Sequence, residues 1–444
     1  MIFTVHFYEK DFSVPILTGL KVQPCQLGWS VYGGPDFAEI RLDGNPEKLI
    51  QMTRLLRCPV QVCDDVGTPV WWGFVQDVLI SIDEVQIGVS LVDLYNRVAV
   101  QYAFISPDNA IADRSRTTTA DHLPSQEEYG IKEIILHRNG IDDDFAASLR
   151  DTFLNLSSLP RSVLSQRLVK RDAHVLVRCA GWFKTLAWLG YQNAEGFYAN
   201  DGPGPGTFNF GQSSSYRYPS QRFTPGASVD LQAAYFQLRS VGGCTRNLNA
   251  QLRDVLGALL ATSSTVSGSS LSGSYYTWVK FTFTTPYTLS AGTAYMIGVT
   301  GNGTNAAQYF AIRTDENQTF SGGYGQYYNG ASWLTLPSIT NPGSAPDLMF
   351  RAVCTSDTGS QISSIVSAGN QFFTGIRVPS TGVLTCPFRD NGDDCLKELA
   401  ALMDLGTSNH RRVLARVTAN RQLEIYEQPH PDQQRRDLRQ CSLD

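Results

Sequence analysis

The stretch between residues 205 and 355 constrains the fold most, because it is almost free of charge. It holds one Lys, seven Arg and five acidic residues, whereas charged residues make up 17% of the whole chain. Ser, Thr, Gly, Asn and Tyr take their place, a composition typical of a β-sandwich whose outer faces are polar but neutral. The Gly/Pro/Ser segment in front of it, NDGPGPGTFNFGQSSS, cannot hold a helix and predicts a linker. We therefore expect an inserted sandwich.

The segments on either side have ordinary composition and predict a β-rich framework. Before residue 100, short strands alternate with the turn signals YGGPD, LDGNP and DVGTP. They predict a small antiparallel barrel or sandwich in which Trp71 and Trp72 point to opposite faces. After the insert, a helix from Asp393 to Gly406 precedes two strands, RRVLARVTA and QLEIYEQP, which form a closing hairpin.

The expected fold class is mainly β with a few helices, an α+β framework of small β-barrel domains plus an inserted antiparallel sandwich of jelly-roll type. A chain of 444 residues is too long for one compact domain. We predict four parts: an N-terminal barrel (1–110), a helix-containing α+β part (111–200), the sandwich (201–357) and a C-terminal α+β part that completes the framework (358–444).

A helix is predicted over residues 142–156. Its acidic first turn complements the positive end of the helix dipole, with Asp142, Asp143 and Asp144. Apolar residues recur every four positions on one face: Phe145, Leu149 and Phe153. A metal site is the alternative interpretation of the acidic triplet, but hard cations need a loop that wraps around them. We therefore interpret the triplet as a helix start.

Charge and hydropathy exclude two classes of partner. Lys and Arg number 36 against 41 for Asp and Glu, which gives a net charge of −5 without a basic stripe. Nucleic acid is therefore not expected as the main partner. No stretch reaches the roughly 18 apolar residues of a membrane span, so we expect no membrane insertion. The start, MIFTVHFYEKDFSVPIL, shows no export signal.

The nine cysteines lie far apart, with no CxxC pair and no Cys/His grouping at zinc spacing. We interpret most of them as reduced core residues. Cys244 and Cys354, near the two ends of the insert, are the one pair to check for a disulfide.

No catalytic constellation stands out in the sequence. Paired carboxylates in a cleft context, Ser/His/Asp groupings, HExxH and phosphate-binding loops are absent, and GVTGNGTNA predicts only a turn. The six histidines stand alone without a metal-spaced partner. Asp64 and Asp65 precede Gly67 and predict a hairpin turn. We expect no enzymatic activity, no cofactor and no metal.

The framework resembles minor tail proteins of long-tailed phages that are related to baseplate hubs. A strand-pair pattern of that group, V-x-D-x-x-G-x-P-V-W-x-G-x-V, runs here from Val62 to Val75. The other segments that carry the resemblance are GWSVYGGPDFAEIRLDGNPEKL, VSLVDLYNRVAVQY, VLVRCAGWFKTLAWLGY and LKELAALMDLGTSNHRRVLARVTANRQLEIYEQP. The resemblance spans the chain outside the insert. The resemblance implies a structural role in the virion.

The insert resembles a jelly-roll module that is appended to many surface and carbohydrate-active proteins. The pattern W-x-x-F-x-F-x-x-P-x-x-L-x-x-G-T-x-Y is matched by Trp278, Phe281, Phe283, Pro286, Leu289, Gly292, Thr293 and Tyr295. Alternating aromatic residues would fill a sandwich core, and the glycine would supply a turn. The resemblance implies a carbohydrate-binding-like fold, and it implies binding only weakly.

Glycan binding needs exposed aromatic faces for sugar C–H groups, together with neutral amide and hydroxyl partners. The loop GGYGQYYNGASW supplies both. The candidate glycan-binding residues are Tyr324, Gln326, Tyr327, Tyr328, Asn329 and Trp333. The alternative is that half of them alternate into the core and the rest are ordinary surface residues.

We therefore expect a structural subunit of a phage tail tip or baseplate, assembled in the host cytoplasm. Its framework would associate with copies of itself in a ring, expected to be a homotrimer, and with other tail proteins. The sandwich would contact host-surface glycans, with avidity from several copies. One alternative is a secreted or cell-surface protein that binds or cleaves glycans. Another is a purely structural insert.

Overall fold

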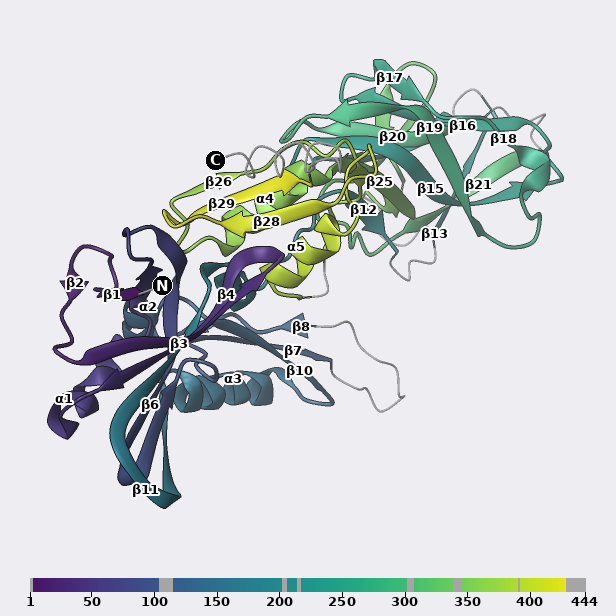
Figure 1. Ribbon diagram of the computed structural model, residues 1–444. Helices are drawn as coiled ribbons and strands as arrows, with labels where there is room; N and C mark the ends of the chain where they lie inside the picture. Colours follow the sequence, from purple (N-terminus) through teal and green to yellow (C-terminus); the bar gives the residue numbers. More distant parts are fainter. Residues whose placement is uncertain are drawn as a thin grey trace, which may run out of the picture. The chain divides into compact units, whose positions relative to one another are not determined.

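The computed structural model describes residues 3–103, 115–201, 206–213, 217–301, 307–337, 345–389 and 392–428. It is mainly β, with few helices, as predicted (Figure 1). The chain forms two compact units, which we call the framework unit and the sandwich unit. The framework unit takes residues 1–191, 359–383 and 391–444, and the sandwich unit takes 192–358 and 384–390.

The predicted parts 1–110 and 111–200 therefore share one unit almost entirely, and the predicted insert 201–357 lies inside the sandwich unit. The structure adds residues 384–390 to the sandwich unit, because the short strand that they contain pairs with the last long strand of the insert.

A ten-stranded sheet organises the framework unit, and all its pairs are antiparallel except β26–β29 and β28–β4. Its path runs through β2 (Pro15–Ile16), β1 (Thr4–Tyr8), β5 (Pro59–Cys63), β6 (Pro69–Ser90), β11 (Arg161–Ala180), β4 (Tyr32–Asp43), β28 (Val413–Val417), β29 (Gln422–Glu427) and β26 (Gly375–Arg377), with β3 (Lys21–Ser30) on β4. The long strands β6 and β11 form a ribbon that extends beyond the rest of the sheet (Figure 1).

A second, smaller sheet and several helices complete the framework unit. The sheet contains β10 (Glu133–Asn139), β7 (Arg97–Ala103), β8 (Ser115–Arg116) and β9 (Ala120–Asp121). The α-helices are α1 (Pro46–Ile50), α2 (Leu123–Tyr129), α3 (Asp143–Ser157), α4 (Thr358–Gly369) and α5 (Cys395–Met403). The 3-10 helices are η1 (Gln51–Leu55) and η2 (Trp182–Trp188). No helix in the described part of the chain is both long and apolar enough to cross a membrane.

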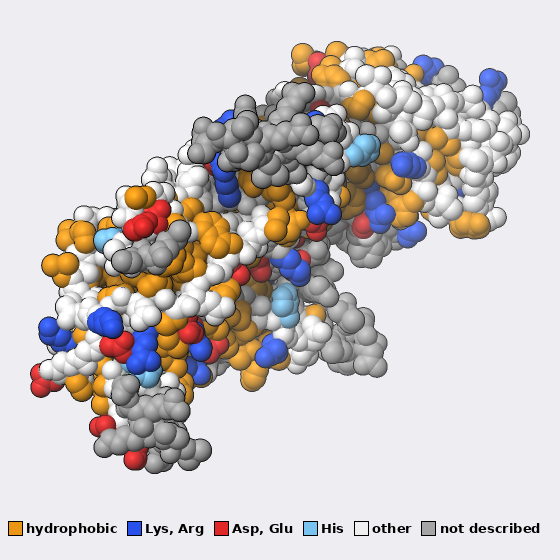
Figure 2. Space-filling model, viewed as in Figure 1, with side chains coloured by type: hydrophobic (Ala, Val, Ile, Leu, Met, Phe, Trp, Pro, Cys, Tyr) orange, Lys and Arg blue, Asp and Glu red, His pale blue; other side chains and the backbone are white. Residues whose placement is uncertain are grey.

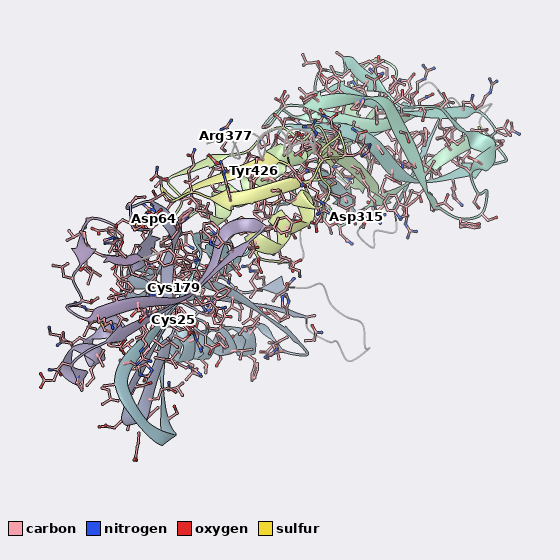
Figure 3. The ribbon with its side chains drawn as sticks, in the orientation of Figure 1. Cys25, Asp64, Cys179, Asp315, Arg377 and Tyr426 are labelled. Atoms are coloured by element: carbon pink, nitrogen blue, oxygen red, sulfur yellow. The ribbon has the colours of Figure 1, made fainter. Side chains whose placement is uncertain are left out.

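The framework core confirms the opposite orientations of the two adjacent tryptophans. Trp71 is fully buried, whereas Trp72 is half-buried and its indole N–H donates to the Val417 carbonyl at 2.9 Å. Asp64 closes the predicted hairpin turn, since its carboxylate accepts from the backbone N–H groups of Val66 and Thr68. Asp64 is labelled in Figure 3.

Helix α3 begins where the sequence predicts. The Asp142 carboxylate caps it by accepting from the Phe145 N–H at 2.8 Å, which supports the helix-start interpretation of the acidic triplet. The predicted apolar face is wrong at Phe145, whose side chain is 59% exposed. The helix instead buries Ala146 and Leu154, because the small alanine lets the first turn pack closely against β7.

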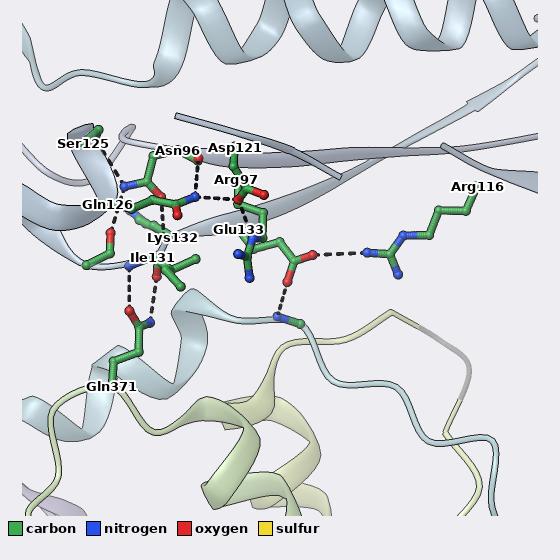
Figure 4. A network of polar contacts seen from close by, with 12 residues as sticks. Asn96, Arg97, Arg116, Asp121, Ser125, Gln126, Ile131, Lys132, Glu133 and Gln371 are labelled. Carbon is green, nitrogen blue, oxygen red and sulfur yellow. Dashed lines mark hydrogen bonds and ion pairs between the residues drawn. The ribbon is translucent and has the colours of Figure 1, made fainter. Parts of the chain in front are cut away.

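A polar network ties segments of the framework unit that are distant in sequence (Figure 4). The buried amide of Asn96 donates to the Gly130 carbonyl at 2.8 Å and accepts from the Lys132 N–H at 2.8 Å. Gln371 exchanges two hydrogen bonds with the backbone of Ile131, at 2.6 and 2.7 Å. These bonds satisfy buried polar groups and fix the chain where it returns from the sandwich unit.

The sandwich unit consists of two antiparallel sheets. The first contains β12 (Phe197–Asn200), β25 (Phe350–Asp357), β15 (Val229–Val241), β21 (Tyr309–Asp315) and β13 (Gly206–Phe210), with β19 (Thr277–Leu289), β24 (Asp347–Leu348) and β27 (Leu384–Thr385) paired to them. The second contains β17 (Leu259–Thr262), β16 (Asn247–Asp254), β20 (Tyr295–Gly301), β14 (Arg217–Phe223), β22 (Gly325–Tyr328) and β23 (Trp333–Thr335), with β18 (Val266–Ser267) on β16. A short 3-10 helix, η3 (Gly268–Ser270), follows β18.

Aromatic side chains fill the space between the two sheets, as predicted. Phe281 and Phe283 are fully buried, and Gly292 takes a positive φ of 71° in its turn. Trp278 is the exception, since it is only partly buried and lies under the guanidinium of Arg351 at 4.3 Å. In the view of Figure 2 the surface of this unit is mostly uncharged.

All eight described cysteines are free thiols, and six of them are buried. Cys244 and Cys354 both lie in the sandwich core without a bridge. Cys25 is exposed, and Figure 3 labels it together with the buried Cys179. The interpretation of most cysteines as reduced core residues is therefore confirmed over the described residues.

Candidate functional site

Strand register lines up three of the site's side chains on the outer face of the second sheet. Arg217 on β14 pairs with Tyr328 on β22, and Tyr328 pairs with Trp333 on β23. Directly paired residues on antiparallel strands project to the same face. The three side chains therefore form a row across the edge of the sheet.

Tyr218, which follows Arg217, completes an aromatic cluster. Its backbone takes a positive φ of 47° at the bulge in β14, and its ring stacks on Tyr328 with centroids 6.1 Å apart and planes 21° apart. The rings of Tyr328 and Trp333 lie 5.5 Å apart. These rings line a hollow of about 510 Å³, with the other walls formed by Arg253, Leu256, Gly257, Ala331 and Ser332.

Arg253 holds a positive charge beside these rings. Its guanidinium carbon lies 5.8 Å from the Tyr218 ring and 6.0 Å from the Trp333 ring. The group is fixed in place, because it donates to the Gly257 carbonyl at 2.6 Å and to the Gln251 side chain at 2.7 Å. Such a fixed cation and flanking rings form a preorganised surface.

The same face continues along β22 to a second hollow. Tyr324, Gln326 and Tyr328 alternate with inward-facing residues, so all three lie on this face. The Tyr324 hydroxyl accepts from Arg222 at 3.2 Å. This hollow measures about 640 Å³ and is lined by Gln318, Phe320, Ser321, Gly323, Tyr324, Thr335 and Ala345.

The structure separates the remaining two predicted site residues from this face. Tyr327 packs against the sandwich core, with its ring 5.2 Å from that of Phe208. The Asn329 side chain closes the β22–β23 turn by accepting from the N–H groups of Ala331 and Ser332 at 2.9 and 2.8 Å. The structure therefore leaves these two side chains with structural roles, because strand alternation and turn geometry direct them away from the face.

Sequence reasoning missed Tyr218, Arg217, Arg222 and Arg253. A signal for two of them was present, since Arg222 and Arg253 each stand next to a core residue in a strand that is mostly uncharged. Alternation therefore predicts that both point outward. It does not predict that strands separated by 30 to 110 residues meet at one place.

A pair of buried carboxylates is the second feature that sequence reasoning missed. Asp315 on β21 and Asp347 on β24 are directly opposed and fully buried (Asp315 is labelled in Figure 3). Asp315 accepts from the N–H groups of Asn317 and Thr319, and Asp347 accepts from the Phe320 N–H and from Gln221. The pair therefore fixes the loop that leads into β22.

The two carboxyl groups have opposite pKa shifts. Burial, reinforced by the charge of Asp315, raises the pKa of Asp347 to about 6. Burial also acts to raise the pKa of Asp315, but hydrogen bonds from Thr319, Asn317 and Asn200 outweigh it and lower that pKa. Neither side chain lines the hollows described above. We assign the pair a structural role.

The framework unit has a hollow of about 550 Å³ beside β29, lined by residues that include Arg377 and Tyr426 (Figure 3). Its Arg416 is neutralised, because the guanidinium pairs with Glu424 at 2.6 Å. Its lining has one aromatic residue, Tyr426, against three in the first hollow of the sandwich unit, so it offers less aromatic surface to a ligand. Over the described residues, no group of three or more His, Cys, Asp or Glu side chains is arranged to hold a metal.

No protein-family model matches the sequence, and no curated protein matches it. Among solved structures, a glycoside hydrolase family 43 arabinoxylan arabinofuranohydrolase from Bacillus subtilis aligns with 66% of this chain at 9% identity and a TM-score of 0.17. The alignment covers 64% of that enzyme, which is less than two thirds of its length. PNGase F, a glycosylasparaginase from Flavobacterium meningosepticum, aligns with 69% of this chain and 99% of its own at 11% identity and a TM-score of 0.17. Similarities this low carry no argument about function.

Proposed function

We propose that the sandwich unit binds glycans through the outer face of its second sheet. The observation that carries the proposal is the gathering of Tyr218, Tyr328 and Trp333 around the fixed guanidinium of Arg253. Aromatic faces stack on sugar C–H surfaces, while amide and guanidinium groups donate to hydroxyls. Three rings in an open hollow supply such a platform. The fold is mainly β and contributes the rigid sheet that positions it.

We further propose that the chain is a structural subunit of a phage tail tip or baseplate and not an enzyme. The resemblance of the framework to hub-related tail proteins supports this role. A second support is an apolar patch at the β3–β4 hairpin, where large side chains are exposed: Trp29, Val31, Tyr32 and Phe37. Exposed apolar patches mark interaction surfaces. Copies of this chain, expected to be three, would assemble through it in the virion, beside other tail proteins.

Glycan binding can be tested with the full chain on an array of bacterial and plant polysaccharides, followed by calorimetry on the best ligand. Trp333→Ala and Tyr328→Ala are each expected to weaken binding about tenfold, since stacking contributes about 1 kcal/mol or more per ring. Tyr275→Ala is the matched control, because Tyr275 is exposed in the same unit but outside the hollow.

If the control loses as much affinity as the two variants, the proposed location of the binding site is contradicted. If the wild-type chain binds no glycan, the alternative of a purely structural insert is favoured. Release of shortened sugars during incubation would favour the secreted or cell-surface glycan-cleaving alternative.

A further inference from the structure

We infer that this face selects acidic glycans, which carry carboxylate, sulfate or phosphate groups, over neutral glycans of the same backbone. The inference rests on the proposed glycan binding and names its ligand class. The observation behind it is that several arginines lie on this face. Stacking of a sugar on the aromatic rings does not by itself require them.

Three arginines lie on the outer face of the second sheet. Arg217 shares a row with Tyr328, as described above. Arg222 on β14 and Arg253 on β16 both pair with Met296 on the intervening strand β20, so they flank it on one face. Their sequence neighbours Phe223 and Leu252 point into the core, which confirms the outward direction. Arg217 and Arg253 therefore adjoin the aromatic cluster, and Arg222 lies farther along the same face beside Tyr324.

These cations lack an acidic counterpart on their own sheet. Within the described residues, none of the three arginines forms an ion pair with a carboxylate. Asp254 is the only acidic residue in the strands of this sheet. Its carboxylate is engaged in a turn, where it accepts from the N–H groups of Leu256 and Ala258 at 2.9 and 2.8 Å.

One arginine of the first sheet does pair with a carboxylate. Arg351 on β25 pairs with the carboxylate of Asp201 through two nitrogens, at distances from 2.8 to 3.1 Å. Arg217, Arg222 and Arg253 have no such carboxylate partner among the described residues, although the chain as a whole carries a net charge of −5. An anionic ligand supplies the missing charge.

The chemistry of the guanidinium agrees with this ligand class. Its planar set of N–H donors matches carboxylate, sulfate and phosphate oxygens, and charge-assisted hydrogen bonds are about twice as strong as neutral ones. Arg253 already stacks beside the rings, so a sugar on the platform would place an acidic substituent within reach. A neutral sugar would gain only stacking and ordinary hydrogen bonds.

The test compares acidic polysaccharides with their own neutral forms. The full chain is titrated with polygalacturonate, hyaluronan, a sulfated glycan and a glycerol-phosphate polymer. Each is matched with its carboxyl-reduced, desulfated or dephosphorylated counterpart. At least one acidic member is expected to bind about tenfold or more tightly than its counterpart. Its affinity is expected to fall as the salt concentration rises from about 0.05 to about 0.5 M, because salt screens exposed charges.

Arginine variants locate the effect. Arg217→Gln, Arg222→Gln and Arg253→Gln are each expected to weaken binding of the acidic form about fivefold more than binding of the neutral form. Arg246→Gln is the control, since Arg246 is exposed in the same unit but lies before β16, away from the face. Arg253→Gln also loses the bond to the Gly257 carbonyl, so a misfolded variant could imitate the expected loss. Arg217→Gln makes the same test without removing that bond.

The outcomes separate the two proposals. Equal binding of acidic and neutral forms would overturn the selectivity for acidic glycans and leave glycan binding in place. Binding of no glycan at all would overturn both. Tighter binding of single-stranded DNA, used as a competitor, would also overturn the inference, because the face would then serve a nucleic acid.

Discussion

At the scale of single residues, Asp347 shows how position determines what a side chain does. The sequence contains few acids in this region, and nothing in their spacing distinguishes Asp347 from a surface residue. In the fold it is fully buried opposite Asp315 and accepts from Gln221. Burial, together with the neighbouring charge, raises its pKa to about 6. The native state therefore binds this proton more tightly than the unfolded chain does.

This shift predicts a pH dependence with a definite sign. A raised pKa stabilises the fold below the ordinary value of 3.8, and the contribution is lost as the pH rises through about 6. The free energy of unfolding of the wild type, minus that of Asp347→Asn, is expected to fall by roughly 2 kcal/mol between pH 4 and pH 7. Urea unfolding followed by tryptophan fluorescence measures it.

The control for this prediction is Asp230→Asn, a partly exposed carboxyl in the same unit that accepts from Thr288. A fall of the same size in this control would assign the effect to the unit as a whole and not to Asp347. A difference for Asp347→Asn that stays flat from pH 4 to pH 7 would contradict the raised pKa.

At the scale of elements, helix α3 follows from local sequence rules. Its first turn is acidic, and Asp142 satisfies a backbone N–H that the helix leaves without a partner. Its packing face depends on contacts that the local sequence does not contain, which is why Phe145 lies outside the core. The cap is therefore determined by the sequence of the helix itself, whereas the face that is buried is determined by the elements that pack against the helix.

The cap gives a matched pair of variants. Asp142→Ala is expected to lower the free energy of unfolding of the framework unit by about 1 kcal/mol, because it removes the capping bond. Asp144→Ala removes only a charge from the same exposed turn and is expected to cost about 0.5 kcal/mol or less. Thermal unfolding with and without added calcium measures both effects. A strong calcium stabilisation abolished by either change would favour the metal-site interpretation.

At the scale of the whole molecule, assembly is the property on which the proposed tail role depends. The apolar patch at the β3–β4 hairpin contains Val31, which is 70% exposed. Val31→Asp is expected to shift the purified chain from a ring of several copies to a monomer, because a charge in an apolar interface loses its hydration. Mass photometry across a concentration series measures the shift.

Val66→Asp is the control for assembly, since Val66 is even more exposed to solvent than Val31 and lies in the β5–β6 turn, outside the patch. It is expected to leave the oligomeric state unchanged. A wild-type chain that stays monomeric at micromolar concentration and is missing from any phage particle would contradict the virion role and favour the cell-surface alternative.

The sequence by itself determined the features that depend on neighbours along the chain. These include the mainly β class, the uncharged sandwich, the Asp64 turn, the helix starts and the alternation that buries Phe281 and Phe283. Local backbone geometry and residue chemistry suffice for them. Only the tertiary structure decided that Tyr218, Arg253 and Trp333 meet on one face. That meeting depends on strand register, which is set between segments far apart in the chain, and a shift of one residue would turn each side chain to the opposite face.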